Sequence, residues 1–199
     1  MRILALSPHT DDAELGAGGT LARYVEEGHR VMVVALSTGN PVDGSNKAEM
    51  AAAMAMLGVK QWNIHDFHCR AYQGQRADIL QELEQLCTVF QPSLVFCPSL
   101  NDTHQDHVTV THEALRAFRR SGILAYELLR NWITPFAPIH YVKLSTSHIE
   151  AKIAALACYQ SQQHRPYFAE AITRGLALVR GMQVEAEYAE AFEVLRWVE

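Results

Sequence analysis

The chain has 199 residues, 49% of them hydrophobic and 20% charged, and its 17 Lys and Arg against 22 Asp and Glu give a formal net charge of −5. The length suits one globular domain with a full hydrophobic core. A mildly acidic chain without a basic tract lacks the electrostatic surface that binds nucleic acid or an acidic membrane, so both are excluded as partners. Ten His and four Cys, with no C-x-x-C pair, indicate that a bound metal would have nitrogen and oxygen ligands.

The first apolar run, from Ile3 to Leu6, is too short for the core of a signal peptide, and no cleavage site follows it. No later apolar stretch approaches the ~20 residues that a membrane-spanning helix needs. We therefore expect a cytoplasmic protein without a membrane span, whose scattered cysteines are reduced. The sequence leaves the assembly open and is compatible with a homo-oligomer.

Short apolar runs alternate with helical patterns along the chain, which is typical of β-α-β units around a parallel sheet. Strands are predicted at residues 3–7, 30–37, 61–64, 93–97, 123–129 and 139–144. Helices are predicted at 15–27, 47–57, 76–90, from after 107 to about 118, at 148–159 and at 166–180, before a final segment at 188–198. This order predicts one α/β domain over residues 1–199 with a mostly parallel sheet. Residues 131–199 are expected to complete the sheet and to wall the pocket, two roles that the sequence does not separate.

Polar side chains gather directly after two of the predicted strands. The segment 8–19 places His9, Asp11 and Asp12 after the first strand, and 102–107 follows the strand at 93–97 with His104, Asp106 and His107. Open parallel sheets bind ligands at the carboxyl ends of their strands. Buried carboxylates need a counter-charge, so a cation is expected there. Together the two loops offer the His and Asp donors of a three-ligand catalytic zinc site.

Each cluster alone also has a simpler explanation. An Asp-Asp pair often caps a helix with a solvated acid, and histidines three residues apart often cap a helix or pair with an intervening acid. Gly16, Gly18 and Gly19 resemble a dinucleotide fingerprint, but Leu21 stands where its last glycine should be. We therefore expect the glycines to let the first helix start close to the metal loop, with its positive end supporting negative charge nearby.

These residues resemble the signature of a known family. Pro8-His9-Thr10-Asp11-Asp12, followed by Gly16 and Gly18-Gly19 and later by His104-Gln105-Asp106-His107, is similar to the motif pair of the PIG-L/LmbE-like zinc-dependent de-N-acetylases, which act on N-acetylglucosaminyl conjugates. Weaker similarities at 49–58, Ser161-Gln162 and 189–192 extend the resemblance over nearly the whole chain.

The resemblance implies a Rossmann-like three-layer αβα sandwich. It also implies a hydrolase that removes the acetyl group from an N-acetylated amino sugar or small sugar conjugate of the GlcNAc type, by means of a metal-activated water. The expected metal is Zn²⁺, with Fe²⁺ as an alternative. The implied roles are metal ligands for His9, Asp12 and His107, general base for Asp11, oxyanion stabiliser for His104, and orientation of His104 for Asp106.

Departures from the family pattern leave the substrate open. Asn46 stands where several members carry an Arg, with Lys47 beside it, and Asp102 stands where some have a Tyr. The alternatives are a metal-binding protein without catalysis and an amidase for a non-sugar acyl amide. A nucleotide-binding oxidoreductase is disfavoured by Leu21.

Other residues are interpreted more simply. Among the remaining histidines, His65 and His140 are the best candidates for lining the pocket. Asp66 and Arg70 fit either a sugar contact or a solvated loop. Core positions, not a cofactor site, are expected for Trp62, Trp132, Trp197, Met50, Met54 and Met56.

Overall fold

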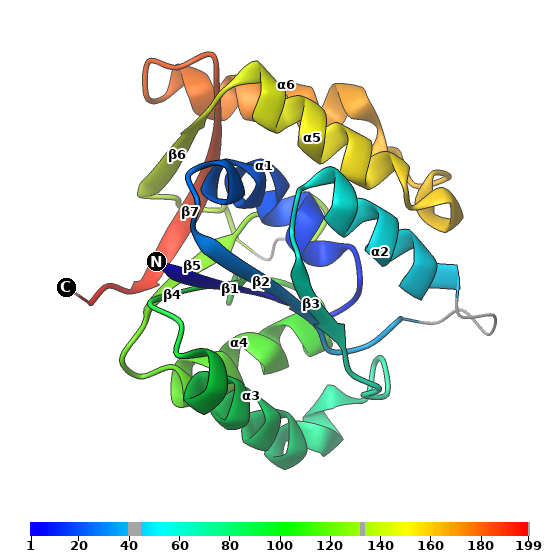
Figure 1. The fold of residues 1–199 in the computed structure, drawn as a ribbon, viewed down its shortest axis with the longest axis vertical. Helices are drawn as coiled ribbons and strands as arrows, with labels where there is room; N and C mark the ends of the chain where they lie inside the picture. The colour runs from blue at the N-terminus through cyan, green and yellow to red at the C-terminus, as the bar shows by residue number, and fades with distance from the viewer. Residues whose placement is uncertain (40–44, 132–133, 199) are drawn as a thin grey trace.

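A mixed sheet runs through the molecule in the computed structural model, which describes residues 1–39, 45–131 and 134–198 (Figure 1). Within these residues the sheet has seven strands in the order β3-β2-β1-β4-β5-β7-β6. The first five strands in this order are parallel, and β7 is antiparallel to both of its neighbours. The strands are β1 (Arg2–Ser7), β2 (Arg30–Ala35), β3 (Gln61–Ile64), β4 (Leu94–Pro98), β5 (Gly122–Tyr126), β6 (His140–Leu144) and β7 (Tyr188–Arg196).

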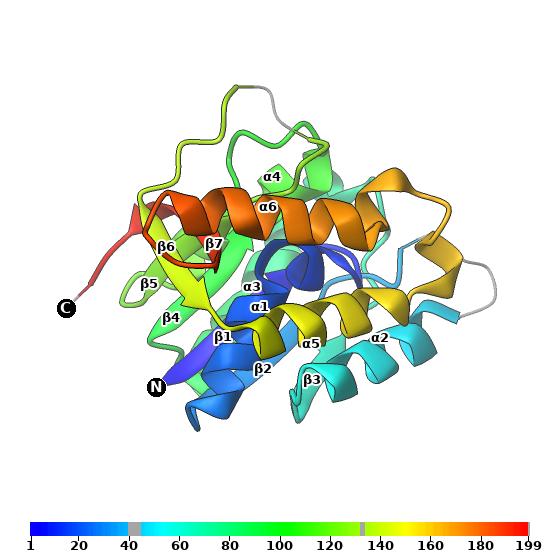
Figure 2. The same cartoon turned by 90° about the horizontal axis from the view of Figure 1, so that it is seen from above.

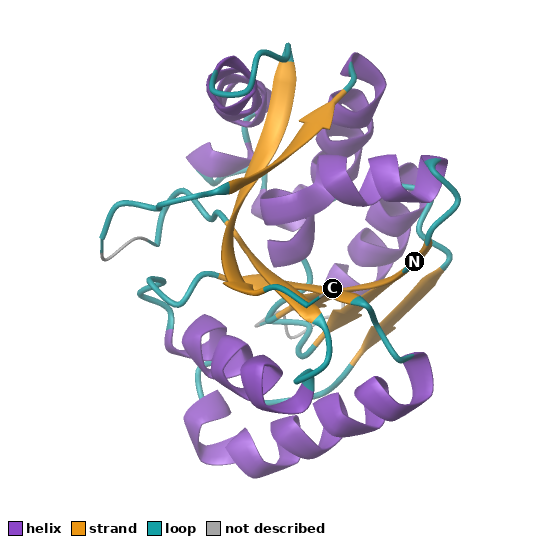
Figure 3. Ribbon diagram, turned by 90° about the vertical axis from the view of Figure 1, so that its left-hand side faces the viewer, coloured by secondary structure: helices purple, strands orange, loops and turns teal. Residues whose placement is uncertain are grey.

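Helices cover both faces of the sheet and make three layers (Figures 1 and 3). The helices are α1 (Asp12–Glu26), α2 (Ser45–Met56), α3 (Arg76–Phe90), α4 (Gln105–Ala117), α5 (Thr146–Ala157) and α6 (Glu170–Met182). Helices α3 and α4 lie on one face, and the other four lie on the opposite face, where α5 and α6 pass over α1 (Figure 2). Short 3-10 turns are η1 (Tyr72–Gln75), η2 (Gln160–Gln162) and η3 (Pro166–Phe168). None of the helices in the described segments is both long and apolar enough to cross a bilayer.

The hydrophobic core is split by the sheet into two halves. Along β1, Ile3 and Ala5 pack on the α1 side, while Leu4 and Leu6 pack on the side of α3 and α4. Successive strand side chains point to opposite faces, and both faces are covered, so the whole strand is apolar. This confirms the three-layer α/β fold.

The predicted elements are present, and the differences lie at their ends. Helix α1 begins at Asp12 rather than residue 15, because the Leu15 N–H already donates to the Asp11 carbonyl at 3.0 Å. The predicted helix 166–180 is divided, since Pro166 opens the separate turn η3 and α6 begins at Glu170. Residues 188–196 form β7, which enters between β5 and β6.

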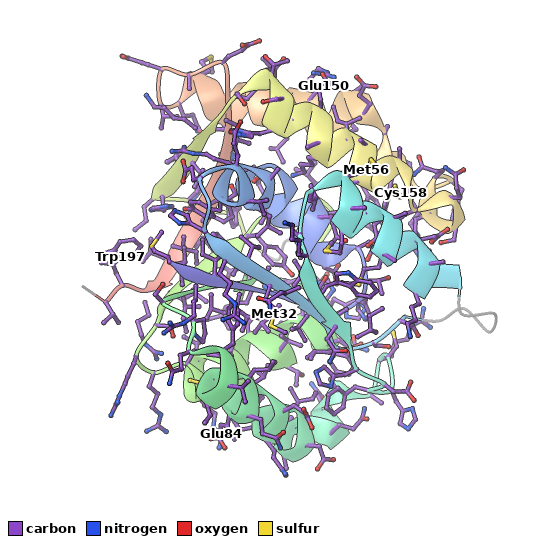
Figure 4. The ribbon with its side chains drawn as sticks, in the orientation of Figure 1. Met32, Met56, Glu84, Glu150, Cys158 and Trp197 are labelled. Carbon is purple, nitrogen blue, oxygen red and sulfur yellow. The ribbon has the colours of Figure 1, made fainter. Side chains whose placement is uncertain are left out.

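Two expected core residues are on the surface (Figure 4). Met50 and Met54 are buried, but Met56 at the end of α2 is 50% exposed. Trp197 follows the last residue of β7 and is 56% exposed. Trp132 lies outside the described residues. The apolar pattern therefore predicts correctly that Met50 and Met54 are buried, but it is wrong for Met56 at the exposed end of α2.

The strand order creates a crevice at the carboxyl ends of β1 and β4. These strands are neighbours, and the chain leads from β1 to β2 on one side and from β4 to β5 on the other. Such a switch point is where doubly wound sheets bind ligands, because the two loops diverge and leave space between them. Both polar clusters of the sequence follow these two strands.

Candidate active site

The loop after β1 is held in place by two tyrosines from distant segments. The Tyr72 hydroxyl donates to the Pro8 carbonyl oxygen at 2.7 Å, and the Tyr159 hydroxyl donates to the Thr10 carbonyl oxygen. Both tyrosines are fully buried. They fix the backbone on either side of His9. No sequence motif links either tyrosine to the loop, so these contacts are visible only in the folded chain.

The loop after β4 is organised by a buried aspartate, Asp102. Its Oδ1 accepts the His104 backbone N–H at 2.7 Å, and its Oδ2 lies 2.7 Å from Nδ1 of His107. His104 caps helix α4, since its Nδ1 accepts the Asp106 backbone N–H at 3.2 Å. In the sequence Asp102 is only a departure from the family pattern, yet in the structure its carboxylate sets the orientation of His107.

Three side-chain atoms from the two loops converge on one point. Asp12 Oδ2 lies 3.1 Å from His9 Nδ1 and 3.3 Å from His107 Nε2, and the two nitrogens are 3.4 Å apart. The other nitrogen of each ring contacts a carboxylate, since His9 Nε2 is 3.2 Å from Asp106 and His107 Nδ1 contacts Asp102. Each ring therefore lies between two carboxylates, which only accept hydrogen bonds, so without a metal the inner nitrogens can also donate to Asp12. With a metal bound, the outer nitrogens would keep their protons, and the two inner lone pairs and the Asp12 oxygen would form a donor set that fits a divalent metal ion.

Charge interactions at this point favour a cation. Burial lowers the pKa of His9, but its hydrogen bonds to Asp106 and Asp12 outweigh burial and raise the pKa to about 12. Burial also lowers the pKa of His107, whereas the charge of Asp12 and the hydrogen bond to Asp102 bring it up to about 9. The same histidines hold the pKa of Asp12 well below its usual value, against the effect of burial. The carboxylates thus draw positive charge into the space between the rings.

Two further combinations of described residues bring ligand atoms within 4.8 Å of one another. One replaces Asp12 by His104 beside His9 and His107, and the other joins His9 to Cys69 and Asp106. His104 already uses its Nδ1 to accept a backbone N–H. The set with Asp12 has contacts of 3.1 to 3.4 Å and leaves His104 for another role, which fits a tetrahedral ion with an open position.

Asp11 lies at the N-cap position of α1 but makes no side-chain capping hydrogen bond. Its side chain lines the cavity beside the converging atoms. The simple explanation of Asp11 as a helix cap therefore fails. Burial, and then the negative charge of Asp12, raise the pKa of Asp11 to about 6, against the opposing charges of His9 and Arg165. A carboxyl with a raised pKa is a better proton acceptor near neutral pH than an ordinary one.

His104 lines the same cavity and stacks on His107, with ring centroids 4.5 Å apart. Burial, and then repulsion by His107 and His9, lower the pKa of His104. Because Nδ1 accepts the Asp106 backbone N–H, the proton of the neutral ring is on Nε2. His104 can therefore donate an N–H to a ligand while uncharged.

The position of Asp106 differs from the expectation that it orients His104. Its Oδ2 contacts His9 Nε2 and also accepts the backbone N–H of Arg70 at 2.5 Å. Asp106 is fully buried. These contacts aim the carboxylate across to the β1 loop, and the hydrogen bond that the ring of His104 accepts comes from the backbone N–H of Asp106.

The cavity next to these residues has a volume of about 370 Å³. Its wall includes Asn46 and Arg70, but not His65, Asp66 or His140, and Lys47 is exposed outside it. Residues from the C-terminal third also line it, among them Arg165, Tyr167 and Ile172. The sequence could not single out this group, because the residues carry no motif and converge only in the folded chain.

Comparisons with known proteins agree with the fold and identify the family. The family model for GlcNAc-PI de-N-acetylase (PIG-L) matches residues 4–118. The uncharacterized deacetylase YaiS of Escherichia coli (strain K12) is 32% identical over 168 residues, which are 80% of this chain and 90% of that protein. The chain therefore belongs to the PIG-L de-N-acetylase family. It is an enzyme, a hydrolase of the N-deacetylase type.

Other relatives cover nearly the whole chain. The diacetylchitobiose deacetylase of Thermococcus kodakarensis is 25% identical, covering 95% of this chain and 81% of that protein. The 4-oxalmesaconate hydratase of Pseudomonas putida is 28% identical, covering 92% and 80%. Among solved structures, the conserved protein TT1542 from Thermus thermophilus superposes with a TM-score of 0.83 at 26% identity, covering 99% of this chain and 96% of that chain.

Proposed function

We propose that this protein is a zinc-dependent deacetylase that removes the acetyl group from an N-acetylated amino sugar or a small conjugate of one. The observation that carries the proposal is the convergence of His9 Nδ1, Asp12 Oδ2 and His107 Nε2 within 3.4 Å of one another. These three residues are the proposed metal ligands. The family description and the deacetylase relatives support the reaction and the type of substrate.

A zinc ion held there would act as a Lewis acid on the acyl oxygen and lower the pKa of a water from ~15.7 towards ~7. In the proposed mechanism Asp11 accepts a proton from the attacking water, since its carboxylate is not used to cap α1. The Nε2–H of His104 donates to the oxygen of the acetyl carbonyl as negative charge develops on it. The proton held by Asp11 is then available to the departing amine.

The two other aspartates have supporting roles in this proposal. Asp102 holds His107 and Asp106 holds His9, each through the ring nitrogen that faces away from the metal. A carboxylate on that nitrogen fixes the ring orientation and raises the basicity of the ligand atom. Asp106 thus supports a metal ligand, and the orientation of His104 depends on the cap of α4.

The test compares wild type with Asp11→Asn for bound metal and for acetate released from a panel of N-acetyl sugars. We expect the variant to bind one zinc per chain, as the wild type does, and to lose turnover by about 10²–10⁴-fold. Asp78→Asn is the matched control, because Asp78 is exposed on α3. Unchanged turnover in Asp11→Asn would exclude Asp11 as the base.

The same experiment tests three other functions. The protein could be a metal-binding protein without catalysis, an amidase for a non-sugar substrate, or a hydratase like the Pseudomonas putida relative. Bound zinc without acetate from any N-acetyl sugar would contradict the proposed function. Acetate released only from non-sugar acetamides would support the proposed deacetylation and exclude an amino sugar as the substrate.

A further inference from the structure

Three arginines from three separate segments line the cavity. Arg70 follows β3, Arg130 follows β5, and Arg165 lies between η2 and η3. No motif of the sequence connects them, and the proposed reaction uses none of them. Their convergence is a product of the tertiary fold.

Tyr167 holds two of these arginines. The Arg165 Nη1 donates to the Tyr167 hydroxyl at 2.6 Å, and its guanidinium carbon lies 6.0 Å from the ring centroid. The guanidinium carbon of Arg130 lies 5.8 Å from the same centroid. Stacking on an aromatic ring orients a guanidinium group while leaving its other N–H groups free to donate.

None of the three has a carboxylate within ion-pair distance among the residues that the structure describes. Ion pairs are formed elsewhere by Arg23, Arg76, Arg116, Arg174 and Arg180. All three arginines that line this cavity thus have guanidinium groups without a carboxylate partner among the described residues, in a chain with an excess of acidic residues.

The other charges of the cavity wall are already balanced or already assigned. Glu127 is bound by Arg180 through two contacts of 2.7 and 3.0 Å, and Lys152 is paired with Glu190 at 2.6 Å. Asp11 and Asp12 belong to the proposed catalytic group. Neighbouring cations around one small cavity repel one another, and a bound anion relieves that repulsion.

We propose that the substrate carries a carboxylate or phosphate group in addition to its N-acetyl sugar, and that Arg165, Arg130 and Arg70 bind this anionic group. The inference rests on the proposed function and adds the charge of the substrate to it. A guanidinium group donates two parallel hydrogen bonds to either anion, which gives direction as well as attraction. A cavity of about 370 Å³ suits a small conjugate of this kind.

The first measurement compares substrates that differ only in charge. The carboxymethyl glycoside of N-acetylglucosamine is paired with its neutral carboxamide, and N-acetylglucosamine 1-phosphate is paired with the methyl glycoside. We expect kcat/KM to be about 10- to 100-fold higher for the anionic member of at least one pair, mainly through KM. The pair that responds identifies the anion as carboxylate or phosphate. High salt should reduce the advantage.

The second measurement assigns the effect to the arginines. Arg165→Ala should lower the ratio of kcat/KM for the anionic substrate to kcat/KM for its neutral partner by about 10-fold, whereas Arg165→Lys should retain part of this ratio. Arg120→Ala is the matched control, because Arg120 is exposed outside the cavity. Thermal unfolding of each variant checks that the fold is retained.

The outcomes separate this inference from the proposed function. Equal kcat/KM for charged and neutral substrates, with acetate released from both, would overturn the inference and leave the function intact. Calorimetric binding of the four compounds to zinc-loaded Asp11→Asn, with and without Arg165→Ala, gives a readout without turnover. Tighter binding of the charged compounds only when Arg165 is present, with no acetate released from any compound by the wild type, would support the anion site and reject the function. Equal binding of all four compounds, again without acetate, would reject both.

Discussion

At the scale of single residues, the orientation of each ring depends on a hydrogen bond to its outer nitrogen. His107 points its Nε2 at Asp12 because Nδ1 is held by Asp102, whereas the neutral ring of His104 carries its proton on Nε2 because Nδ1 accepts a backbone N–H. Similar histidines in one short segment therefore differ in what they can do. One presents a lone pair and the other presents an N–H.

Asp102→Asn is predicted to weaken zinc binding by about 10- to 100-fold. An asparagine has one acceptor oxygen, whereas Asp102 uses one oxygen for the His104 N–H and the other for His107. Competition with a chromophoric chelator measures the zinc affinity. Asp66→Asn, at an exposed position outside the cavity, should bind zinc like wild type. Wild-type affinity in Asp102→Asn would mean that the carboxylate does not support His107.

His104→Ala is predicted to lower kcat by about 10²–10³-fold while retaining the metal, because the lost N–H would act mainly in the transition state. Steady-state kinetics and metal analysis on the same sample check this. His112→Ala removes an exposed histidine from the same helix and should have no effect. If His104→Ala instead lost its zinc, the ligand set with His104 would be favoured over the one with Asp12.

At the scale of elements, the glycines of α1 allow this helix to pack closely against the sheet. A Cβ at Gly16 would lie 2.2 Å from Cδ2 of Tyr126, and one at Gly19 would lie 2.6 Å from Leu144. Tyr126 is also held by its hydroxyl, which donates to the Leu6 carbonyl oxygen at 2.9 Å. The helix that begins at the metal loop therefore sits directly on the strands, a role of its glycines that the sequence did not predict.

Gly16→Ala is predicted to lower the free energy of unfolding by about 1–3 kcal/mol, because the added methyl group overlaps a buried ring. Gly175→Ala is the matched substitution in the interior of α6, where a Cβ meets nothing within 4 Å. It should raise the free energy of unfolding by about 0.5–1 kcal/mol through the lower entropy of the unfolded chain. Urea unfolding of both variants measures whether the free energy of unfolding falls or rises. A Gly16→Ala variant as stable as the wild type would contradict the close packing of α1 on Tyr126.

At the scale of the whole molecule, a buried ion pair joins the C-terminal third to α1. Lys152 of α5 donates to Glu190 of β7 at 2.6 Å and to the Leu15 carbonyl oxygen at 2.7 Å. Glu190 also accepts the backbone N–H groups of Gly19 and Thr20. Segments far apart in the chain are thus connected to the helix that begins with Asp12.

Lys152→Met is predicted to cost about 3–5 kcal/mol of unfolding free energy, since it leaves the carboxylate of Glu190 buried without its cation. The double variant Lys152→Met with Glu190→Gln removes the charge as well and should recover part of this loss. Arg23→Met breaks a half-exposed pair with Glu27 on α1 and should cost no more than about 1 kcal/mol. Urea unfolding measures all three, and equal losses for Lys152→Met and Arg23→Met would contradict the prediction.

The sequence by itself determined the α/β order of the elements, the buried strands and the two polar clusters. These depend on local patterns, such as the alternation of burial along β1 or the placement of acids directly after a strand. Such patterns act over a few residues and are visible without the fold. The sequence does not predict that β1 and β4 are neighbours; His9 and His107 are paired there because both clusters directly follow strands and because the two motifs resemble those of the de-N-acetylase family.

Only the tertiary structure decided which atom each side chain contacts. The Asp106 carboxylate lies on His9 rather than His104 because the backbone N–H of Arg70 approaches it from another loop. Tyr72 and Tyr159 reach the β1 loop from segments distant in sequence, and Arg130 and Arg165 meet on Tyr167. Contacts of this kind depend on the packing of whole elements against one another, which no short stretch of sequence encodes.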